Sequence, residues 1–205
     1  MKVNNPLSNI LNSKVKVDCL RHMCLYPSEL NGRELSRHLT VTHRSIHKAM
    51  RSLVDEGVVD FTSHGNSFGY KLNKEKWIVK KMLLPLFKTE KVFLEVIIEK
   101  IKKGIEGLAL RKSILSVVLF GSVHRKEDKS SSDFDIFVLI DLEENVGSIE
   151  EGIINLGSNI SKIYGVTLGP YFKSLDSFKK DKSLSVIKTI MASNRLIYGK
   201  ELSRI

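Results

Sequence analysis

Residues 114–140 read ILSVVLFGSVHRKEDKSSSDFDIFVLI, the most informative segment of the chain. An apolar run ends in Gly121-Ser122, a polar and partly basic loop follows, and a second apolar run opens with Asp133-Phe134-Asp135. Short apolar runs bounded by glycine and serine are typical of buried β-strands. The pattern predicts two buried strands joined by a polar loop, with a glycine turn ending the first and an acidic pair opening the second.

The acidic pair suggests a metal-dependent reaction. Asp133 and Asp135 lie two residues apart on a predicted strand, so both side chains project to the same face. Two adjacent carboxylates repel each other unless a cation lies between them, and hard oxygen ligands suit Mg²⁺ shared with substrate phosphates. We therefore predict that Asp133 and Asp135 are catalytic residues and metal ligands.

The turn and the loop suggest a bound phosphate. Gly121 allows the backbone to approach a phosphate closely, and Ser122 adds a hydroxyl beside amides that can hold phosphate oxygens. Arg125 and Lys126 in the loop are expected to meet the remaining phosphate charge. Together these residues predict in-line phosphoryl or nucleotidyl transfer.

The motif resembles the signature of the nucleotidyltransferase superfamily that includes DNA polymerase beta and the minimal nucleotidyltransferases. It reads Gly121-Ser122, ten intervening residues, then Asp133-Phe134-Asp135. The resemblance covers about residues 88–200. It implies an α/β nucleotidyltransferase-fold domain with a small mixed sheet, a nucleoside triphosphate (NTP) substrate, and Mg²⁺ or Mn²⁺ as cofactor.

One carboxylate of that family pattern is missing. Active members add a third acid from a neighbouring strand, whereas the candidate strand at 165–172, GVTLGPYF, has none. Either Thr167 or Gly169 falls where the carboxylate is expected. Asp141 shares a strand face with the acidic pair but lies roughly 20 Å along it, and Asp176 follows the strand. The group that accepts the proton is therefore an open question.

The N-terminal part predicts a winged helix-turn-helix. Residues 14–56 read as three helices, with Asn31 and Glu34 spaced as a capping box and Thr42 placed to cap the third helix. Residues 58–72 alternate as a β-hairpin, and 64–66 have turn chemistry. Three helices and a hairpin within this length are typical of that DNA-binding fold.

The third helix carries the candidate DNA-binding face. Its outward positions are basic, and the start of such a helix is where bases are contacted in the major groove. Hairpin residues are expected to reach flanking phosphates. The predicted contacts to double-stranded DNA are Thr42, His43, Arg44, Ser45, His47, Lys48, Arg51, His64, Asn66 and Lys71. A winged helix used only for protein contacts, with a solvated basic face, is the alternative.

The composition agrees with a polyanionic partner. The 205 residues carry a formal net charge of +10, which favours binding to phosphate backbones. Cys19 and Cys24 are expected to be buried and unpaired. We see no signal peptide and no apolar run of about 18 residues, so a cytoplasmic protein without membrane contact is expected.

The overall prediction is an α+β chain with a DNA-binding domain at 1–75 and a nucleotidyltransferase-like domain at 76–205, with 76–87 as a linker. Three functions remain open. The first is nucleotide transfer from NTP to a protein or small-molecule hydroxyl. The second is a transcriptional regulator whose second domain is a degenerate nucleotide sensor or scaffold. The third, raised by the resemblance, is an antitoxin-like partner of a helical toxin. Whether the chain is a homodimer or an active enzyme is also open.

Overall fold

The chain forms two compact units. The computed structural model describes residues 2–64 and 67–205, and the units are Met1–Phe93 and Leu94–Ile205. The second unit contains the mixed sheet expected from the sequence, so the chain is of the α+β class. Each unit has its own apolar core.

The three helices expected over residues 14–56 begin at the residues that the sequence indicates, and a short further helix precedes them. Asn31 and Glu34 form a complete capping box, and the Thr42 side chain accepts a hydrogen bond from the Ser45 amide. These caps satisfy amides that have no partner inside the helix. The helices are α1 (Leu7–Ile10), α2 (Lys14–Leu25), α3 (Gly32–Leu39) and α4 (His43–Asp55).

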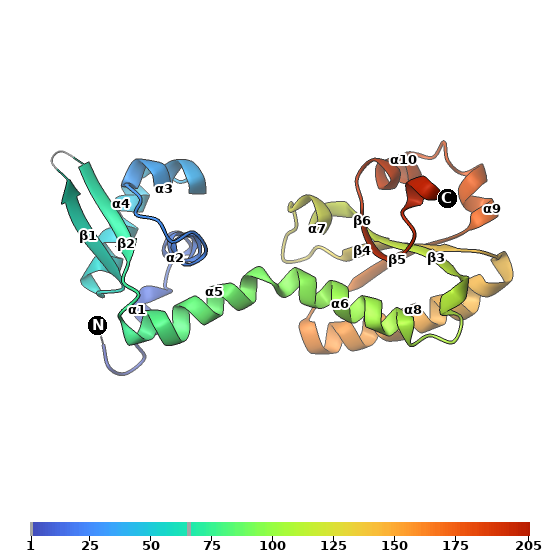
Figure 1. The fold of residues 1–205 in the computed structure, drawn as a ribbon, viewed down its shortest axis with the longest axis horizontal. Coiled ribbons are helices and arrows are strands. Elements are labelled where there is room, and N and C mark those ends of the chain that lie inside the picture. Colours follow the sequence, from blue (N-terminus) through green and yellow to red (C-terminus); the bar gives the residue numbers. More distant parts are fainter. Residues whose placement is uncertain (1, 65–66) are drawn as a thin grey trace. The chain divides into compact units, whose positions relative to one another are not determined.

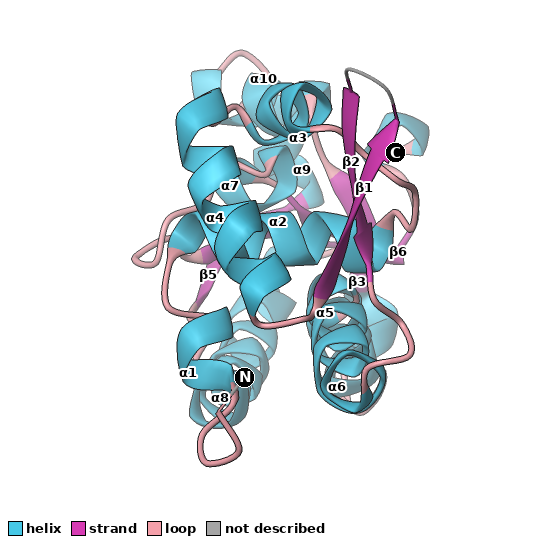
Figure 2. Ribbon diagram, turned by 90° about the vertical axis from the view of Figure 1, so that its left-hand side faces the viewer, coloured by secondary structure: helices cyan, strands magenta, loops and turns pink. Residues whose placement is uncertain are grey.

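The expected hairpin is also present. Strands β1 (Val59–His64) and β2 (Ser67–Leu72) pair in antiparallel register and form a twisted ribbon (Figure 2). A further backbone bridge joins Leu30 to Tyr70, and Tyr70 is almost fully buried. Because side chains alternate along a strand, Phe61, Phe68 and Tyr70 lie on one face of the hairpin. That face packs on the helices near Tyr70.

The segment predicted to be a linker packs in the first unit instead. It forms a π-helical turn, η1 (Val79–Leu83), and then α5 (Leu84–Lys91). Ile78, Val79, Leu83 and Phe87 join the core of helices α2–α4. The two units therefore divide after Phe93 and not at residue 75, because this segment has an apolar face that the first core buries.

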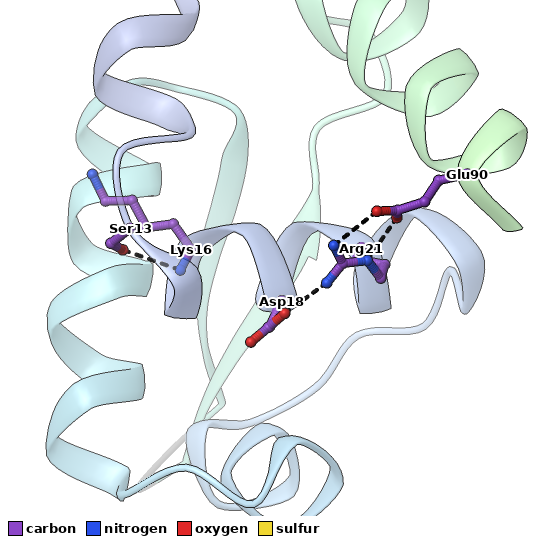
Figure 3. A network of polar contacts seen from close by, with 5 residues as sticks. All are labelled: Ser13, Lys16, Asp18, Arg21 and Glu90. Carbon is purple, nitrogen blue, oxygen red and sulfur yellow. Dashed lines mark hydrogen bonds and ion pairs between the residues drawn. The ribbon is translucent and has the colours of Figure 1, made fainter. Parts of the chain in front are cut away.

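An ion pair reinforces that packing. The Arg21 guanidinium on α2 donates to both carboxylate oxygens of Glu90 on α5, at 2.6 and 2.9 Å, and also contacts Asp18 (Figure 3). A bidentate guanidinium–carboxylate pair fixes direction as well as distance. Because the pair lies at the surface, it contributes little to the free energy of unfolding. Its role is to orient α5 against α2.

The second unit is built on a four-stranded mixed sheet in the order β5-β4-β3-β6. Only the β4–β5 pair is parallel. Its strands are β3 (Ile114–Leu119), β4 (Phe134–Ile140), β5 (Leu168–Ser174) and β6 (Arg195–Gly199). Its helices are α6 (Phe93–Glu106), α7 (Gly121–Arg125), α8 (Val146–Tyr164), α9 (Leu175–Lys180) and α10 (Ser185–Ala192), with short 3-10 turns at Arg111–Ser113, Glu143–Asn145 and Leu202–Arg204.

Helices cover both faces of this sheet (Figure 1). Helices α6 and α8 pack on one face, against side chains such as Ile136 and Val138. Helices α9 and α10 pack on the other, against Val118 and Phe137. The start of β4 lies at one end of the sheet, so a polar residue there on the α9–α10 face is only partly buried. Asp135 occupies that position.

The cysteines are buried and unpaired, as expected. Burial, and for Cys19 the nearby Asp18 charge, raises the pKa of the Cys19 thiol to about 12 and that of Cys24 to about 11. Both thiols therefore stay protonated at neutral pH and act as apolar core groups. Among the described residues, no helix combines the length and the apolar character needed to cross a bilayer.

Candidate active site

The ends of β3 and β4 bring Gly121 beside Asp135. The Phe120 amide donates to the Asp135 carbonyl at 3.0 Å, which fixes the glycine next to the acidic pair. Gly121 has a φ of +76°, and a Cβ at this position would overlap the Asp135 carboxylate. Glycine is therefore required for two reasons, a left-handed backbone and a close approach. Ser122 follows at the start of α7 and is half-buried.

The two carboxylates lie close enough to interact. Asp133 is exposed just before β4, and Asp135 is half-buried as the second residue of the strand. Burial raises the pKa of Asp135, the negative charge of Asp133 raises it further, and the positive charge of Arg125 lowers it. The ionised pair is thus disfavoured in the free protein, and a cation placed between the carboxylates would relieve the repulsion.

The two basic loop residues are placed differently. Arg125 ends α7 and acts electrostatically on Asp135, while its Nε donates to Glu127 at 2.8 Å. A phosphate would therefore compete with Glu127 for this guanidinium. Lys126 is exposed in a left-handed cap with φ of +60°.

On β5, the residue that lies beside the acidic pair is Gly169. In the parallel β4–β5 ladder Asp135 pairs with Gly169, so the two residues lie side by side. A Cβ at Gly169 would fall 3.1 Å from Asp135 Oδ1 and 3.5 Å from the Asp133 Cβ. Thr167, the other candidate from the sequence, is exposed and lines a groove shared with α8. The gap beside the acidic pair is therefore at residue 169.

Other acids on nearby elements lie elsewhere. Asp176 is in the first turn of α9, which follows Ser174, and Ser174 pairs with Ile140 at the far end of β4. Five residue steps separate that end from Asp135, roughly 17 Å at ~3.3 Å per residue. Asp141 binds the Leu142 amide and Asn145 at the same far end. Within the described residues, no three His, Cys, Asp or Glu side chains gather as a metal site.

The first unit presents a second candidate site, on α4. Ile46, Ala49, Met50 and Leu53 face the core and Val54 packs against it, so the basic positions of the helix face outward. Ser45 is half-buried, and the exposed predicted contacts are Thr42, His43, Arg44, His47, Lys48 and Arg51. The imidazoles of His43 and His47 pack edge to face with their ring centres 4.4 Å apart. The outward face of α4 is therefore a continuous basic and polar stripe.

The hairpin contributes less to that stripe than expected. Lys71 is exposed but stands opposite Asp60 in the strand register, and this acid offsets its charge. Asn66 and the side chain of His64 lie outside the described residues. Two exposed aromatic residues, Phe61 and Phe68, were not singled out from the sequence. Their strand positions suggest burial, and only the three-dimensional arrangement shows that they extend beyond the core.

Two solved structures show weak similarity to this chain. One is described as a toxin-antitoxin crystal structure with AMP-PNP; it has 16% identity, covers 52% of this chain and 76% of its own, and gives a TM-score of 0.35. The other is TrmBL2, an archaeal chromatin protein described as showing a novel mode of DNA binding. It has 15% identity, covers 91% of this chain and 72% of its own, and gives a TM-score of 0.29. Both TM-scores are too low to establish a shared fold. A search of curated proteins found no match.

A family model gives the decisive comparison. It is described as "Polymerase beta, Nucleotidyltransferase" and matches residues 99–202, slightly over half of the chain. The matched range holds all four sheet strands, the Gly121-Ser122 turn and both acids of the pair. The chain therefore belongs to the polymerase beta nucleotidyltransferase family.

Proposed function

We propose that the second unit transfers a nucleotide from NTP to a hydroxyl group of a protein or a small molecule. The observation that carries this proposal is the contact of Gly121 with Asp135, because it places a phosphate-accessible backbone beside paired carboxylates. Family membership supports the same reaction class. In this proposal Ser122, Arg125 and Lys126 supply polar and cationic groups for the triphosphate.

The proposed reaction forms one phosphorus–oxygen bond and breaks another. The acceptor hydroxyl oxygen forms a bond to the α-phosphorus, the bond from that phosphorus to the bridging oxygen of the β-phosphate breaks, and pyrophosphate leaves. The hydroxyl proton needs a base. Gly169 offers no side chain for that role, so the acceptor, a partner protein or water takes the proton. Such a site would be slow with a simple acceptor.

Asp133 and Asp135 fit a divalent cation that also contacts the triphosphate. Burial and then the negative charge of Asp133 raise the pKa of Asp135, so a cation beside the pair would be favourable, and the hard oxygen donors suit Mg²⁺ or Mn²⁺. When bound, such an ion neutralises phosphate charge and polarises the α-phosphate. Two carboxylates alone make a weak Mg²⁺ site, so we propose that metal and nucleotide bind together.

Nucleotide binding is therefore expected to require the metal. Calorimetry with NTP should give clear binding with Mg²⁺ and much weaker binding with EDTA. Asp133→Asn should remove most of the Mg²⁺ effect. Asp176→Asn is the matched control, since it removes one carboxylate from the far end of the sheet and should leave the Mg²⁺ effect intact. Metal-independent affinity that is unchanged in Asp133→Asn would contradict the assigned metal role.

We also infer that the first unit is a winged helix that binds double-stranded DNA. The specific support is the basic stripe on α4, which has no acid before Asp55 at its end. The hairpin beside α4, extended by the Leu30–Tyr70 bridge, corresponds to the wing. In such folds the helix enters the major groove and the wing contacts the backbone.

The DNA proposal predicts a steep dependence on salt. Arg44→Ala combined with Lys48→Ala should weaken duplex binding and reduce the slope of log K against log salt by about 0.9 for each lost phosphate contact. Lys88→Ala combined with Lys91→Ala removes the same charge from α5 and should change the slope little. Fluorescence anisotropy over a salt series measures both. Equal slopes for the two double variants would exclude α4 as the interface.

A further inference from the structure

A groove lies between α4 and the hairpin of the first unit. Its volume is about 690 Å³, within the usual range for ligand sites. Lys48, Arg51 and Asp55 of α4 line one side, and Phe61 and Phe68 line the other. The groove thus combines an aromatic wall with a charged wall.

The aromatic wall is partly exposed to solvent. The Phe61 and Phe68 side chains are each 47% exposed, and their rings stack at 5.2 Å between centres with 26° between planes. Phe61 also lies 5.6 Å from the ring of the buried Tyr70, which anchors the wall to the core. Exposing two large aromatic residues on one concave surface costs solvation free energy, and such surfaces commonly bind a partner.

The charged wall limits the class of partner. Lys48 and Arg51 are cations suited to phosphate, while Asp55, one turn further along, accepts hydrogen bonds. A nucleotide matches this order, with phosphate at the cations, a base against the phenylalanines and an N–H group of the base toward the acid. Paired bases in a duplex are stacked on each other and cannot offer a face to this wall. The base must therefore be unpaired.

The charge pattern favours a nucleic-acid strand over a free nucleotide. Arg44 lies one turn before Lys48 on the exposed side of α4 and does not line the groove. The cations therefore continue beyond the space that one nucleotide fills, as expected for a surface that follows a phosphate backbone. Aromatic side chains next to a basic path are the usual means of binding single strands.

We propose that this groove binds an unpaired base of a single-stranded DNA segment, stacked on Phe61 and Phe68. The proposal rests on the DNA-binding role assigned above to α4 and extends it from paired to unpaired DNA. It applies to DNA ends, bubbles or locally opened sites. The duplex contacts through Arg44 and Lys48 do not depend on it.

The test uses the full chain and two strands of equal length and charge, oligothymidine and its fully abasic equivalent. The unaltered protein should bind oligothymidine at least about fivefold more tightly, which is the low end of what stacking one base on an aromatic side chain contributes. Phe61→Leu combined with Phe68→Leu keeps apolar volume but removes the aromatic faces, and should abolish the difference. Phe61→Tyr combined with Phe68→Tyr should retain it. Thermal unfolding checks that each variant is folded.

Duplex binding, measured in parallel, separates this proposal from the preceding one. Both proposals are supported if three results hold together. Duplex affinity is lost in Arg44→Ala with Lys48→Ala, duplex affinity is unchanged in the leucine variant, and only the leucine variant loses the preference for oligothymidine over the abasic strand. Equal binding of abasic and normal strands by the unaltered protein would overturn the stacking proposal alone. Thymidine monophosphate that competes as well as the strand would make this a small-molecule site. A leucine variant that changes only the sedimentation behaviour would make it a self-association surface.

Discussion

Asp135→Asn is expected to lower nucleotidyl transfer by about a hundredfold or more. A metal ion supplies several kcal/mol of charge stabilisation, and each ~1.4 kcal/mol changes a rate tenfold. The amide of asparagine keeps the shape of the side chain but carries no charge, so it removes the proposed metal ligand beside Gly121 without opening a cavity. Incubation with labelled NTP, Mg²⁺ or Mn²⁺, and cell lysate as the source of acceptor measures the transfer.

The same variant should not be less stable at neutral pH. Burial and the charge of Asp133 raise the pKa of Asp135 in the folded protein. A raised carboxyl pKa means that the folded state holds its proton more tightly than the unfolded state does, so stability falls as the pH rises through the folded pKa. Asparagine does not ionise. We expect the advantage of Asp135→Asn over the unaltered chain to appear as the pH rises through that range and to persist at neutral pH.

Thermal unfolding as a function of pH, run beside the labelling assay, separates loss of chemistry from loss of fold. Asp176→Asn, at the other end of the sheet, should leave transfer close to its original rate. Asp135→Asn that unfolds at a lower temperature than the unaltered chain at neutral pH would mean that Asp135 stabilises the fold. Transfer that survives in a folded Asp135→Asn variant would remove this residue from the mechanism.

Local chemistry made much of the first unit predictable. Ser13, Asn31 and Thr42 each cap the helix that follows them, and each is recognisable because its hydrogen bonds are made within a few residues. Gly57 follows α4 with a φ of +71°, which is the left-handed position that glycine favours after a helix. These features need no knowledge of the rest of the chain.

The segment after the hairpin was harder to predict because its partner is distant in sequence. Val79, Leu83 and Phe87 are four residues apart, a spacing that fits a helix but does not show which surface that helix packs against. The pattern therefore resembled a linker. The core that buries this segment is formed by α2–α4, and the sequence alone does not show which surface of those helices is available.

In the candidate active site, too, some residues were predictable from local sequence and others were not. The sequence indicated Gly121 and the acidic pair because the turn and the strand start are local features. It left both Thr167 and Gly169 as candidates for the third position and favoured Thr167 for the test, because the choice depends on how β5 pairs with β4. Parallel neighbours are not joined by a short turn, so their register depends on the packing of the intervening α8. In that register Gly169 lies opposite Asp135.

Gly169→Asp should therefore raise nucleotidyl transfer, by about a hundredfold at the low end of what a general base contributes. The backbone at Gly169 does not have a positive φ, so a side chain is tolerated, and its Cβ would be in ordinary contact with the Cβ of Asp133. The contact of 3.1 Å with Asp135 Oδ1 requires that carboxylate to move by a few tenths of an ångström. A third acid beside two others also raises the local repulsion, so the free variant should be less stable and should bind Mn²⁺ more tightly.

The matched control is Gly169→Asn, which has the same size but supplies neither a base nor a charged ligand. Thr167→Asp is a second control, because it adds a carboxylate two residues away, at an exposed position on the groove shared with α8. Only Gly169→Asp should increase both labelled product and Mn²⁺ affinity in calorimetry. If Gly169→Asp and Gly169→Asn transfer at the same rate, the missing carboxylate is not what limits this site. Fast turnover by the unaltered chain would instead show that the acceptor brings its own base, since Gly169 has no side chain to provide one.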